Sequence, residues 1–328
     1  MQVGSGKIVV LGTGGTIAGA SQTRGDEIGY AAGQVAVAQL LRAVPGLATA
    51  PQQWVAEQVA QIDSKDMDWQ VWRSLALRCA HWLGDAGVAG IVITHGTDTL
   101  EETAFFLQML LAPPTPVVLA CAMRPSDALA PDGPQNLADA FAAARAPGAC
   151  GVTAVCAGRI HGAVDVQKVH TYRLDAFGSG DAGPLGYVEA GQVRMVRDWP
   201  AVAQGLPLLR RAALLARLQE GTLEQPRVEV ITSHAGADGR IVDALLAAPQ
   251  PPQGIVVAAT GNGTIHHLLN QALARAAAAG VRVVRATRCA EGRVIPAPRA
   301  QGAWQDSRGL SAVKARIALM LELAAPDC

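Results

Sequence analysis

The 328-residue sequence contains little cysteine, few aromatic residues and no excess charge of either sign, and each shortage excludes a class of protein. Its six cysteines include no C-x-x-C pair and are too few for a disulfide scaffold in a chain of this size. Lys plus Arg and Asp plus Glu number 27 each, which leaves no net field to attract nucleic acid or an anionic membrane. Three tyrosines and four phenylalanines offer few rings for stacking on bases. Nucleic acid is therefore not an expected partner.

Long apolar runs are also absent, although 50% of the residues are hydrophobic and 16% are charged. No run reaches the roughly 18 apolar residues that a membrane-spanning helix requires. The amino-terminal segment lacks the charged region, apolar region and cleavage site of a secretory signal. We therefore expect a cytoplasmic protein with no membrane partner. The high hydrophobic content predicts a large core, and a chain of this length is long enough for two domains.

Short apolar runs typical of buried strands alternate with longer stretches of helical periodicity. The expected strands are Lys7–Leu11, Val88–Thr94, Thr115–Ala120, Gly151–Cys156, Arg227–Thr232, Gly254–Ala259 and Val281–Ala286. The expected helices are Ala31–Ala43, Asp66–Ala86, Leu100–Leu111, Asn136–Ala146, Gly239–Ala248, Ile265–Ala279 and Leu310–Ala324. This alternation predicts an α/β protein, with helices flanking mixed or parallel sheets and right-handed crossovers between parallel strands.

The alternation is interrupted near residues 197–225, where no clear strand occurs. We expect a larger N-terminal domain over residues 1–198, a linker over 199–225, and a smaller C-terminal α/β domain with a parallel sheet over 226–328. Ligands of such sheets bind beyond the carboxyl ends of the strands. The polar, glycine-containing stretches GTGGT, HGTDT and TGNGT each follow a predicted strand, so these strand ends are the expected place for a site.

The stretch GTGGTIAG, Gly12–Gly19, surrounds two threonines with four glycines directly after a predicted strand. Because glycine permits positive φ and the close approach of a ligand, the stretch is interpreted as a phosphate cradle, a nucleophile loop or a plain tight turn. The dinucleotide pattern G-x-G-x-x-G fails, since its sixth position is Ile17 and no acidic residue ends a second strand downstream. The Gly-Lys-Ser/Thr ending of a P-loop is absent as well. Both phosphate-binding patterns are therefore excluded.

The stretch THGTDTLEET, Thr94–Thr103, also follows a predicted strand and precedes a helix. Asp98 and Thr99 are suited to cap that helix, and Glu101 and Glu102 to complement its dipole, so the motif has a purely structural interpretation. Two strand ends that each present a Gly-flanked threonine favour a chemical interpretation instead. A threonine hydroxyl is a poor nucleophile unless a base or a positively charged neighbour assists it.

These two stretches together resemble the two signatures of the bacterial-type L-asparaginases, the threonine amidohydrolases, and the second signature extends to Leu107. The resemblance continues in order along nearly the whole chain. It includes AEQVAQIDSKDM (56–67), VVLACAMRPSDALAPDGPQNL (117–137), DAF…GPLGY (175–187), GNGT (261–264) and SAVKARIALMLELA (311–324). It implies a cofactor-free amidohydrolase that converts L-asparagine to L-aspartate and ammonia through a threonine-linked acyl-enzyme, with glutaminase side activity possible. It also implies a homotetramer, a dimer of intimate dimers.

The resemblance assigns roles to particular positions. Thr16 corresponds to the family's nucleophile and Tyr30 to the tyrosine of the mobile loop that assists it. Thr97, Asp98 and Lys168 correspond to the second threonine, aspartate and lysine, and a desolvated lysine can transfer protons. For substrate binding, Ser64 matches the serine that helps to hold the α-carboxylate. Asn262 matches the asparagine that reaches a neighbouring subunit's site and binds the amino group.

The chain departs from the family's pattern at two places. In RCAEGRVIPAPR, Arg299 stands where a glutamate that binds the substrate's amino group is expected, and Glu291 lies too far upstream to replace it. Asp63 and Lys65 flank the binding serine where many relatives place glycine and glutamine. The preference for Asn over Gln or D-Asn therefore stays open.

Two other functions stay under consideration. One is an ammonia-generating component of an amidotransferase, which resembles asparaginases but has an extra N-terminal domain, for which a first strand at Lys7 leaves no room. The other is a non-catalytic amino-acid sensor, which would not need both threonines. His95 is expected to be packed and hydrogen-bonded rather than catalytic. His266 and His267 have no third ligand spaced to help them, so no metal site is expected.

Overall fold

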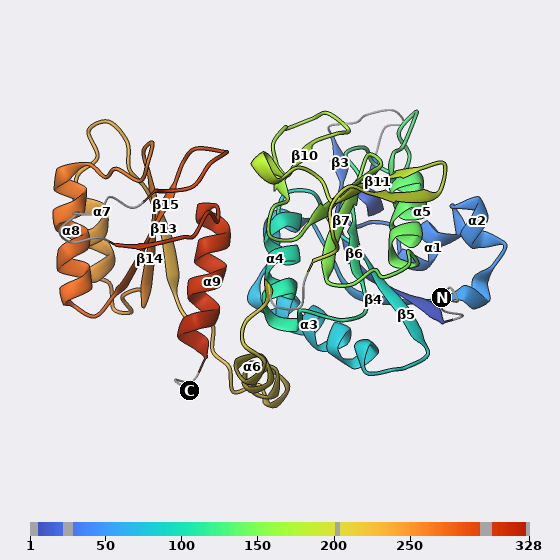
Figure 1. Ribbon diagram of the computed structural model, residues 1–328, viewed down its shortest axis with the longest axis horizontal. Helices are drawn as coiled ribbons and strands as arrows, with labels where there is room; N and C mark the ends of the chain where they lie inside the picture. The colour runs from blue at the N-terminus through green and yellow to red at the C-terminus, as the bar shows by residue number, and fades with distance from the viewer. Residues whose placement is uncertain (1–5, 22–28, 201–203, 296–303, 326–328) are drawn as a thin grey trace. The chain divides into compact units, whose positions relative to one another are not determined.

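The structure is a computed structural model that describes residues 6–21, 29–200, 204–295 and 304–325. The chain forms two compact units, residues 1–211 and 212–328 (Figure 1). Helix α6, Leu208–Glu220, crosses the division between them.

The larger unit is built on an eight-stranded sheet in the order β12-β11-β8-β7-β6-β5-β1-β4. The strands in that order are Gln192–Met195, Gly186–Glu189, Arg159–Gly162, Val152–Cys156, Val117–Ala120, Val88–Thr94, Lys7–Gly14 and Trp54–Ile62. Strands β4, β1, β5, β6 and β7 are mutually parallel, whereas β8, β11 and β12 are each antiparallel to their neighbours. The sheet is therefore mixed.

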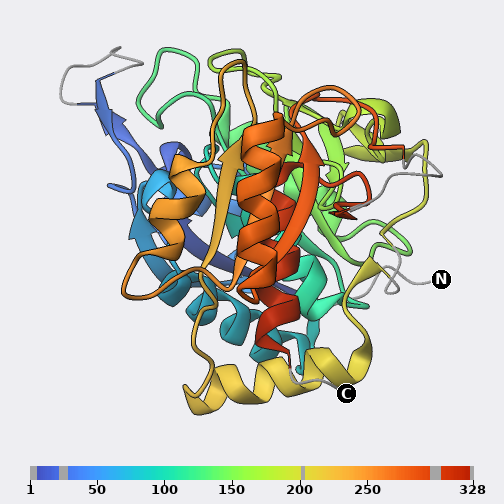
Figure 2. The same cartoon turned by 90° about the vertical axis from the view of Figure 1, so that its left-hand side faces the viewer.

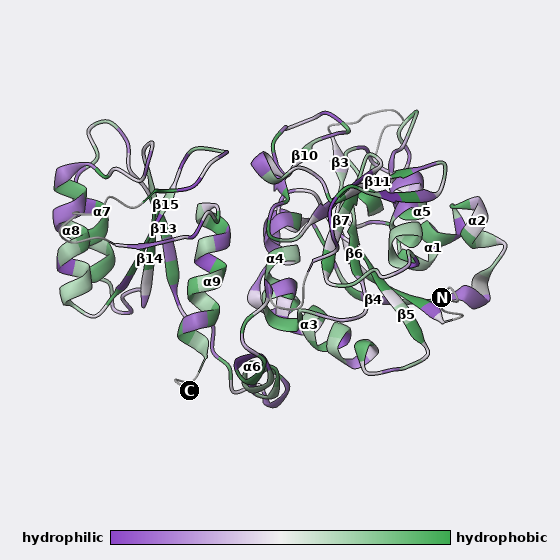
Figure 3. Cartoon of the chain, in the orientation of Figure 1, coloured by the Kyte–Doolittle hydropathy of each residue, from purple (hydrophilic) through white to green (hydrophobic). Residues whose placement is uncertain are grey.

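Helices cover both faces of this sheet, which is why its central strands are continuous apolar runs. Helices α1 (Val37–Arg42) and α5 (Gly133–Ala144) form one core with the sheet, and α3 (Trp69–Leu83) and α4 (Leu100–Leu111) pack against each other on the opposite face (Figure 1). In Figure 3 the strands are largely green, whereas purple gathers in loops and on the outer sides of helices.

One crossover differs from the sequence-based expectation. The connections β5–α4–β6 and β6–α5–β7 advance in the same direction across the sheet, but α4 and α5 lie on opposite faces. They therefore have opposite hands, and the expectation of right-handed crossovers is wrong for one of these two connections. Helix α5 packs on the same core as α1, and this tertiary packing outweighs the usual preference.

The predicted helix Ala31–Ala43 is also too long. Tyr30–Ala31 forms strand β3, which pairs with β2, Ala20–Ser21, and Gly33 has a φ of 68°. Since a left-handed residue ends regular structure, α1 begins only at Val37. The remaining elements of this unit are short: α2 (Pro45–Ala48), the paired strands β9 (Gln167–Lys168) and β10 (Phe177–Gly178), and the 3₁₀ turns Thr16–Ala18, Pro51–Gln53, Ser64–Asp66 and Gly180–Ala182.

The smaller unit has a four-stranded parallel sheet in the order β13-β14-β15-β16. These strands are Val228–Thr232, Gly254–Ala259, Arg282–Thr287 and Gln305–Asp306. Helices α7 (Arg240–Leu246) and α8 (His267–Ala278) cover one face, and α9 (Ala312–Ala324) covers the other; α8 stands in front of the strands in Figure 2. The predicted fold class, a larger α/β unit with a mixed sheet and a smaller one with a parallel sheet, is confirmed.

Candidate active site

Two turns meet at the carboxyl ends of neighbouring strands β1 and β5. Gly12 pairs with Thr94 in the parallel ladder, and the Thr13 hydroxyl donates to the Thr94 carbonyl at 2.8 Å. Gly15 follows with a φ of 81°, and a Cβ at this position would overlap the backbone of Gly96. Because the residues directly before Thr16 and Thr97 are in backbone contact, the chain presents both threonines at one place.

Thr16 is paired with a tyrosine hydroxyl. It begins a short 3₁₀ turn, and its side chain lies mostly out of solvent, with the residue 7% exposed. Its Oγ1 lies 2.6 Å from the phenol oxygen of Tyr30. The antiparallel pair β2–β3 brings Tyr30 back over the turn, with Tyr30 directly opposite Ser21.

Thr97, in the turn after β5, is paired with Lys168 of strand β9. Lys168 Nζ donates to Thr97 Oγ1 at 2.8 Å and to Asp98 Oδ1 at 2.6 Å. Thr97 is 5% exposed, and the side chains of Lys168 and Asp98 are 20% and 54% exposed. The ammonium is thus held between a buried hydroxyl and a carboxylate that reaches solvent. Such a cluster can pass a proton between the threonine and the solvent-facing acid.

The backbone of Lys168 is hydrogen-bonded to Glu101, a residue for which the sequence indicated only an interaction with the helix dipole. The Glu101 carboxylate accepts the Lys168 N–H at 2.8 Å, which ties strand β9 to the first turn of α4. Sequence reasoning missed this role, since the two residues are 67 positions apart.

Ser64 lies beneath the turn that follows β5, which is the turn that contains Gly96 and Thr97. Its hydroxyl accepts the Asp98 N–H at 3.2 Å, and its carbonyl accepts the Thr99 hydroxyl at 2.7 Å. A Cβ on Gly96 would overlap the Ser64 side chain, so the serine packs directly under the turn. The two unusual neighbours, Asp63 and Lys65, form an ion pair with each other at 3.4 Å.

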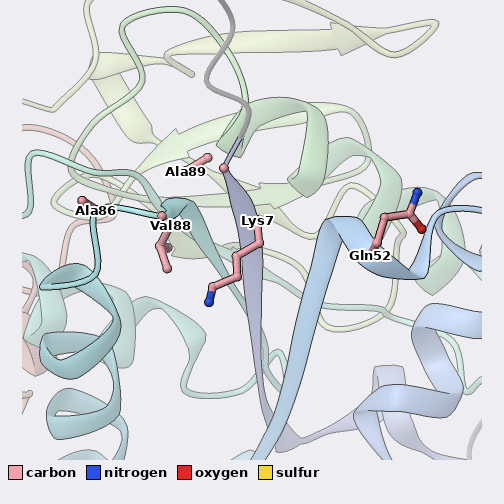
Figure 4. Close-up of a pocket in the computed structure, with 7 residues that line it drawn as sticks. Lys7, Gln52, Ala86, Val88 and Ala89 are labelled. Carbon is pink, nitrogen blue, oxygen red and sulfur yellow. The ribbon is translucent and has the colours of Figure 1, made fainter.

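A cavity of about 380 Å³ opens beside this cluster and is lined by Asp98, Lys168, Val169, His170 and Thr171. A larger cavity of about 650 Å³ lies at the amino ends of β1 and β5, away from the two turns, where Lys7 and Gln52 line it (Figure 4). Lys7 there forms an ion pair with Asp85 at 3.3 Å. Of these two cavities, the smaller one borders the threonine–lysine cluster.

His95 is fully buried between β5 and the second turn. Burial lowers the pKa of His95 to about 4, and a 2.7 Å hydrogen bond between Nδ1 and the Gly96 carbonyl opposes part of that shift. The imidazole is neutral at physiological pH and packs as expected. Within the described residues, no group of three His, Cys, Asp or Glu residues is arranged to hold a metal ion.

Asn262 belongs to the smaller unit. Its side-chain amide exchanges two hydrogen bonds with the backbone of Ile295, at 2.7 Å and 3.0 Å. Arg299 lies outside the described residues. The roles assigned to Asn262 and to the missing glutamate stay predictions.

Comparisons with known proteins agree with the sequence signatures. Residues 7–201 match the family model of the asparaginase N-terminal domain, and residues 227–327 match that of the glutaminase/asparaginase C-terminal domain. L-asparaginase 2 of Bacillus subtilis (strain 168) is 36% identical over 320 residues, which cover 96% of this chain and 82% of that protein. The glutaminase-asparaginase of Pseudomonas fluorescens biotype A is 33% identical over 323 residues, which cover 96% of this chain and 86% of that protein.

A solved structure is similar over a comparable range. The probable cytoplasmic L-asparaginase of Campylobacter jejuni is 34% identical, with a TM-score of 0.86 over 97% of this chain and 95% of that one. No helix of the described residues is long and apolar enough to cross a membrane. The two domain matches, the level of identity and the shared fold agree with one another, and the chain belongs to the asparaginase family.

Proposed function

We propose that this protein is an L-asparaginase, an amidohydrolase that converts L-asparagine and water to L-aspartate and ammonia. The observation that carries the proposal is the pairing of each strand-end threonine with its own assisting group. Thr16 contacts the Tyr30 phenol, and Thr97 contacts the Lys168 ammonium. The backbone contact of Gly15 with Gly96 holds the two pairs on adjoining turns.

In the first half-reaction, Thr16 Oγ1 forms a bond with the side-chain amide carbon of the substrate. As this bond forms, the Thr16 proton passes to the Tyr30 oxygen, 2.6 Å away, and the phenol's own proton passes to the amide nitrogen. The C–N bond breaks, and ammonia leaves a β-acyl ester on Thr16. Backbone N–H groups of the turn that contains Thr97 are suited to stabilise the negative charge on the oxygen of the tetrahedral intermediate. The Asp98 N–H is not one of them, because it donates to the Ser64 hydroxyl.

In the second half-reaction, water attacks the ester carbon, the bond to Thr16 Oγ1 breaks, and that oxygen regains a proton from Tyr30, which is reprotonated from solvent. The cluster of Thr97, Lys168 and Asp98 is suited to take the proton of that water, since it links a buried hydroxyl to a partly exposed carboxylate. We assign Ser64 to the α-carboxylate of the substrate, because its hydroxyl lies under the same turn.

The test is release of ammonia by the purified protein from L-Asn, L-Gln and D-Asn in a coupled assay. We expect turnover of L-Asn and slower turnover of L-Gln, a side activity consistent with the matched glutaminase/asparaginase domain. Binding of L-Asn by calorimetry without release of ammonia would support a sensor instead. Ammonia release that requires an added tRNA-bound partner would support the amidotransferase alternative.

We also propose that the protein is a cytoplasmic homotetramer, built as a dimer of intimate dimers. The proposal rests on the family resemblance and on the solved relative, whose name describes it as probably cytoplasmic. In such a dimer, Asn262 of the partner subunit would bind the substrate's amino group. Light scattering should then give four times the chain mass of 33.9 kDa.

A further inference from the structure

We propose that Asp127 is a positioning residue, which sets the distance between the Tyr30 phenol and Thr16 through the backbone of Ser21. The inference rests on the proposed function of the Thr16–Tyr30 pair. The SDALAPDG motif that contains Asp127 has no place in the mechanism above, and its sequence alone suggests only a turn.

The loop after β6, residues 121–132, forms hydrogen bonds with Gly19 and Ser21, two residues of the segment that follows Thr16. The Ser126 N–H and hydroxyl both donate to the Gly19 carbonyl, at 3.0 Å and 2.7 Å. Two residues further on, the Ser21 N–H donates to Asp127 Oδ2 at 2.8 Å. These contacts join residues more than a hundred positions apart and hold both ends of the tripeptide Gly19–Ser21.

The last two residues of this tripeptide form strand β2, which pairs with β3, the strand that contains Tyr30. Ser21 lies directly opposite Tyr30 in that antiparallel pair. The Tyr30 ring packs on Gly19, where an added Cβ would lie 2.8 Å from Tyr30 Cδ2. A displacement of Ser21 would therefore move Tyr30, whose phenol oxygen lies 2.6 Å from Thr16 Oγ1.

The loop is itself braced, so it can act as a fixed support. The Asp132 carboxylate accepts the N–H groups of Met123 and Arg124, both at 3.0 Å, and Asn136 ties the same carboxylate to the Cys121 carbonyl. Asp127 Oδ1, in contrast, is buried and has no hydrogen-bond partner among the described residues. A buried oxygen without a partner costs stability, so stability alone does not explain the placement of Asp127 against Ser21.

The first test reads the geometry without using activity. The chain has only three tyrosines, so [ζ-¹³C]tyrosine labelling gives few resonances, and Tyr30→Phe assigns that of Tyr30. We expect Asp127→Ala to shift the Tyr30 resonance and leave those of Tyr172 and Tyr187 unchanged. Asp127→Asn, which keeps an acceptor for Ser21, should restore the native position. An unmoved Tyr30 resonance in Asp127→Ala would overturn the proposal, whatever the enzyme's substrate.

The second test uses kinetics. Asp127→Ala should lower kcat by roughly tenfold, since a small misplacement of a catalytic group has a cost of this order. In a Tyr30→Phe background the same substitution should change kcat by less than about twofold, because the group that it positions is gone. Leu129→Ala, at the 96% exposed tip of the same loop, is the control for general disturbance and should behave as wild type.

The outcomes separate this proposal from the proposed function. If Tyr30→Phe leaves kcat intact, the role of Tyr30 in catalysis fails. If Tyr30→Phe lowers kcat but Asp127→Ala lowers it equally in both backgrounds, Asp127 does not act through Tyr30, and the positioning role is rejected while the proposed function stands.

Discussion

At the scale of single residues, the proposed site places a polar partner beside each of two threonine hydroxyls. Such partners are needed because a threonine hydroxyl at neutral pH is a weak nucleophile and a weak proton carrier. Each of the two threonines has a partner that changes this. Tyr30 is 14 positions from Thr16, and Lys168 is 71 positions from Thr97. The two partners also differ chemically, since a phenol contacts one threonine and a lysine side chain contacts the other. This difference suits the two proposed half-reactions, which have different nucleophiles.

Replacement of the proposed nucleophile tests this division. Thr16→Ala should lower kcat for L-Asn by at least about 10³, as loss of an assisted nucleophile usually does. The matched control is Thr153→Val, because Thr153 is also buried and its hydroxyl has no partner among the described residues. Steady-state ammonia release checks both variants, and near-normal turnover by Thr16→Ala would reject its role.

His95 gives a prediction about acid stability. Its folded pKa of about 4 lies below the ordinary value of 6.5, so between these pH values the unfolded chain binds a proton that the folded protein does not. The free energy of unfolding should fall as pH drops from 6.5 toward 4, by roughly 3 kcal/mol if the whole shift is expressed. His95→Asn keeps a donor for the Gly96 carbonyl but cannot titrate. Urea unfolding should show a shallower pH dependence for this variant, and an unchanged slope would contradict the assignment.

At the scale of elements, the site depends on how closely two turns approach. Strands β1 and β5 are neighbours in a parallel sheet, so their carboxyl ends emerge side by side. Glycines at 15 and 96 let the following turns touch through the backbone, with Ser64 packed beneath. The proposed active centre therefore depends on strand order as much as on residue type.

A single added methyl group tests this approach. Gly15→Ala should destabilise the larger unit by at least about 3 kcal/mol, because it combines an unfavourable positive φ with overlap against Gly96. Gly148→Ala is the control, since Gly148 also has a positive φ, 73°, but nothing lies within 4 Å of an added Cβ. Its cost should be only about 1 kcal/mol. Calorimetric unfolding compares the two, and equal losses would show that contact between the turns contributes nothing.

At the scale of the whole molecule, the proposed oligomer predicts that subunits complement one another. Thr16→Ala and Asn262→Ala homo-oligomers should both be weakly active. After mixed refolding in equal amounts, a mixed dimer would have one site with both native residues, so about a quarter of all sites should regain activity by two-fold symmetry. Refolding each variant alone is the control. No gain on mixing would place Asn262 outside the neighbouring subunit's site.

The departure at Arg299 predicts weak recognition of the substrate's amino group. A site that pairs a charged group with its ligand rejects an analogue lacking that group strongly, whereas a site without the pair does not. We expect kcat/KM for L-Asn to exceed that for succinamic acid, which lacks the amino group, by less than about tenfold. Steady-state kinetics with both amides measures the ratio. A preference of several hundredfold would show that another residue replaces the glutamate.

The sequence by itself determined the α/β class, the main strands and the two threonine turns, because these depend on local periodicity and on glycines next to strand ends. Through its resemblance to a family, it also indicated Lys168 and Tyr30. Only the tertiary structure decided the opposite hand of the β6–α5–β7 crossover, the hold of Glu101 on Lys168 and that of Asp127 on Ser21. These features join residues far apart in the chain, and no local pattern encodes a contact whose two partners meet only after the sheet has formed.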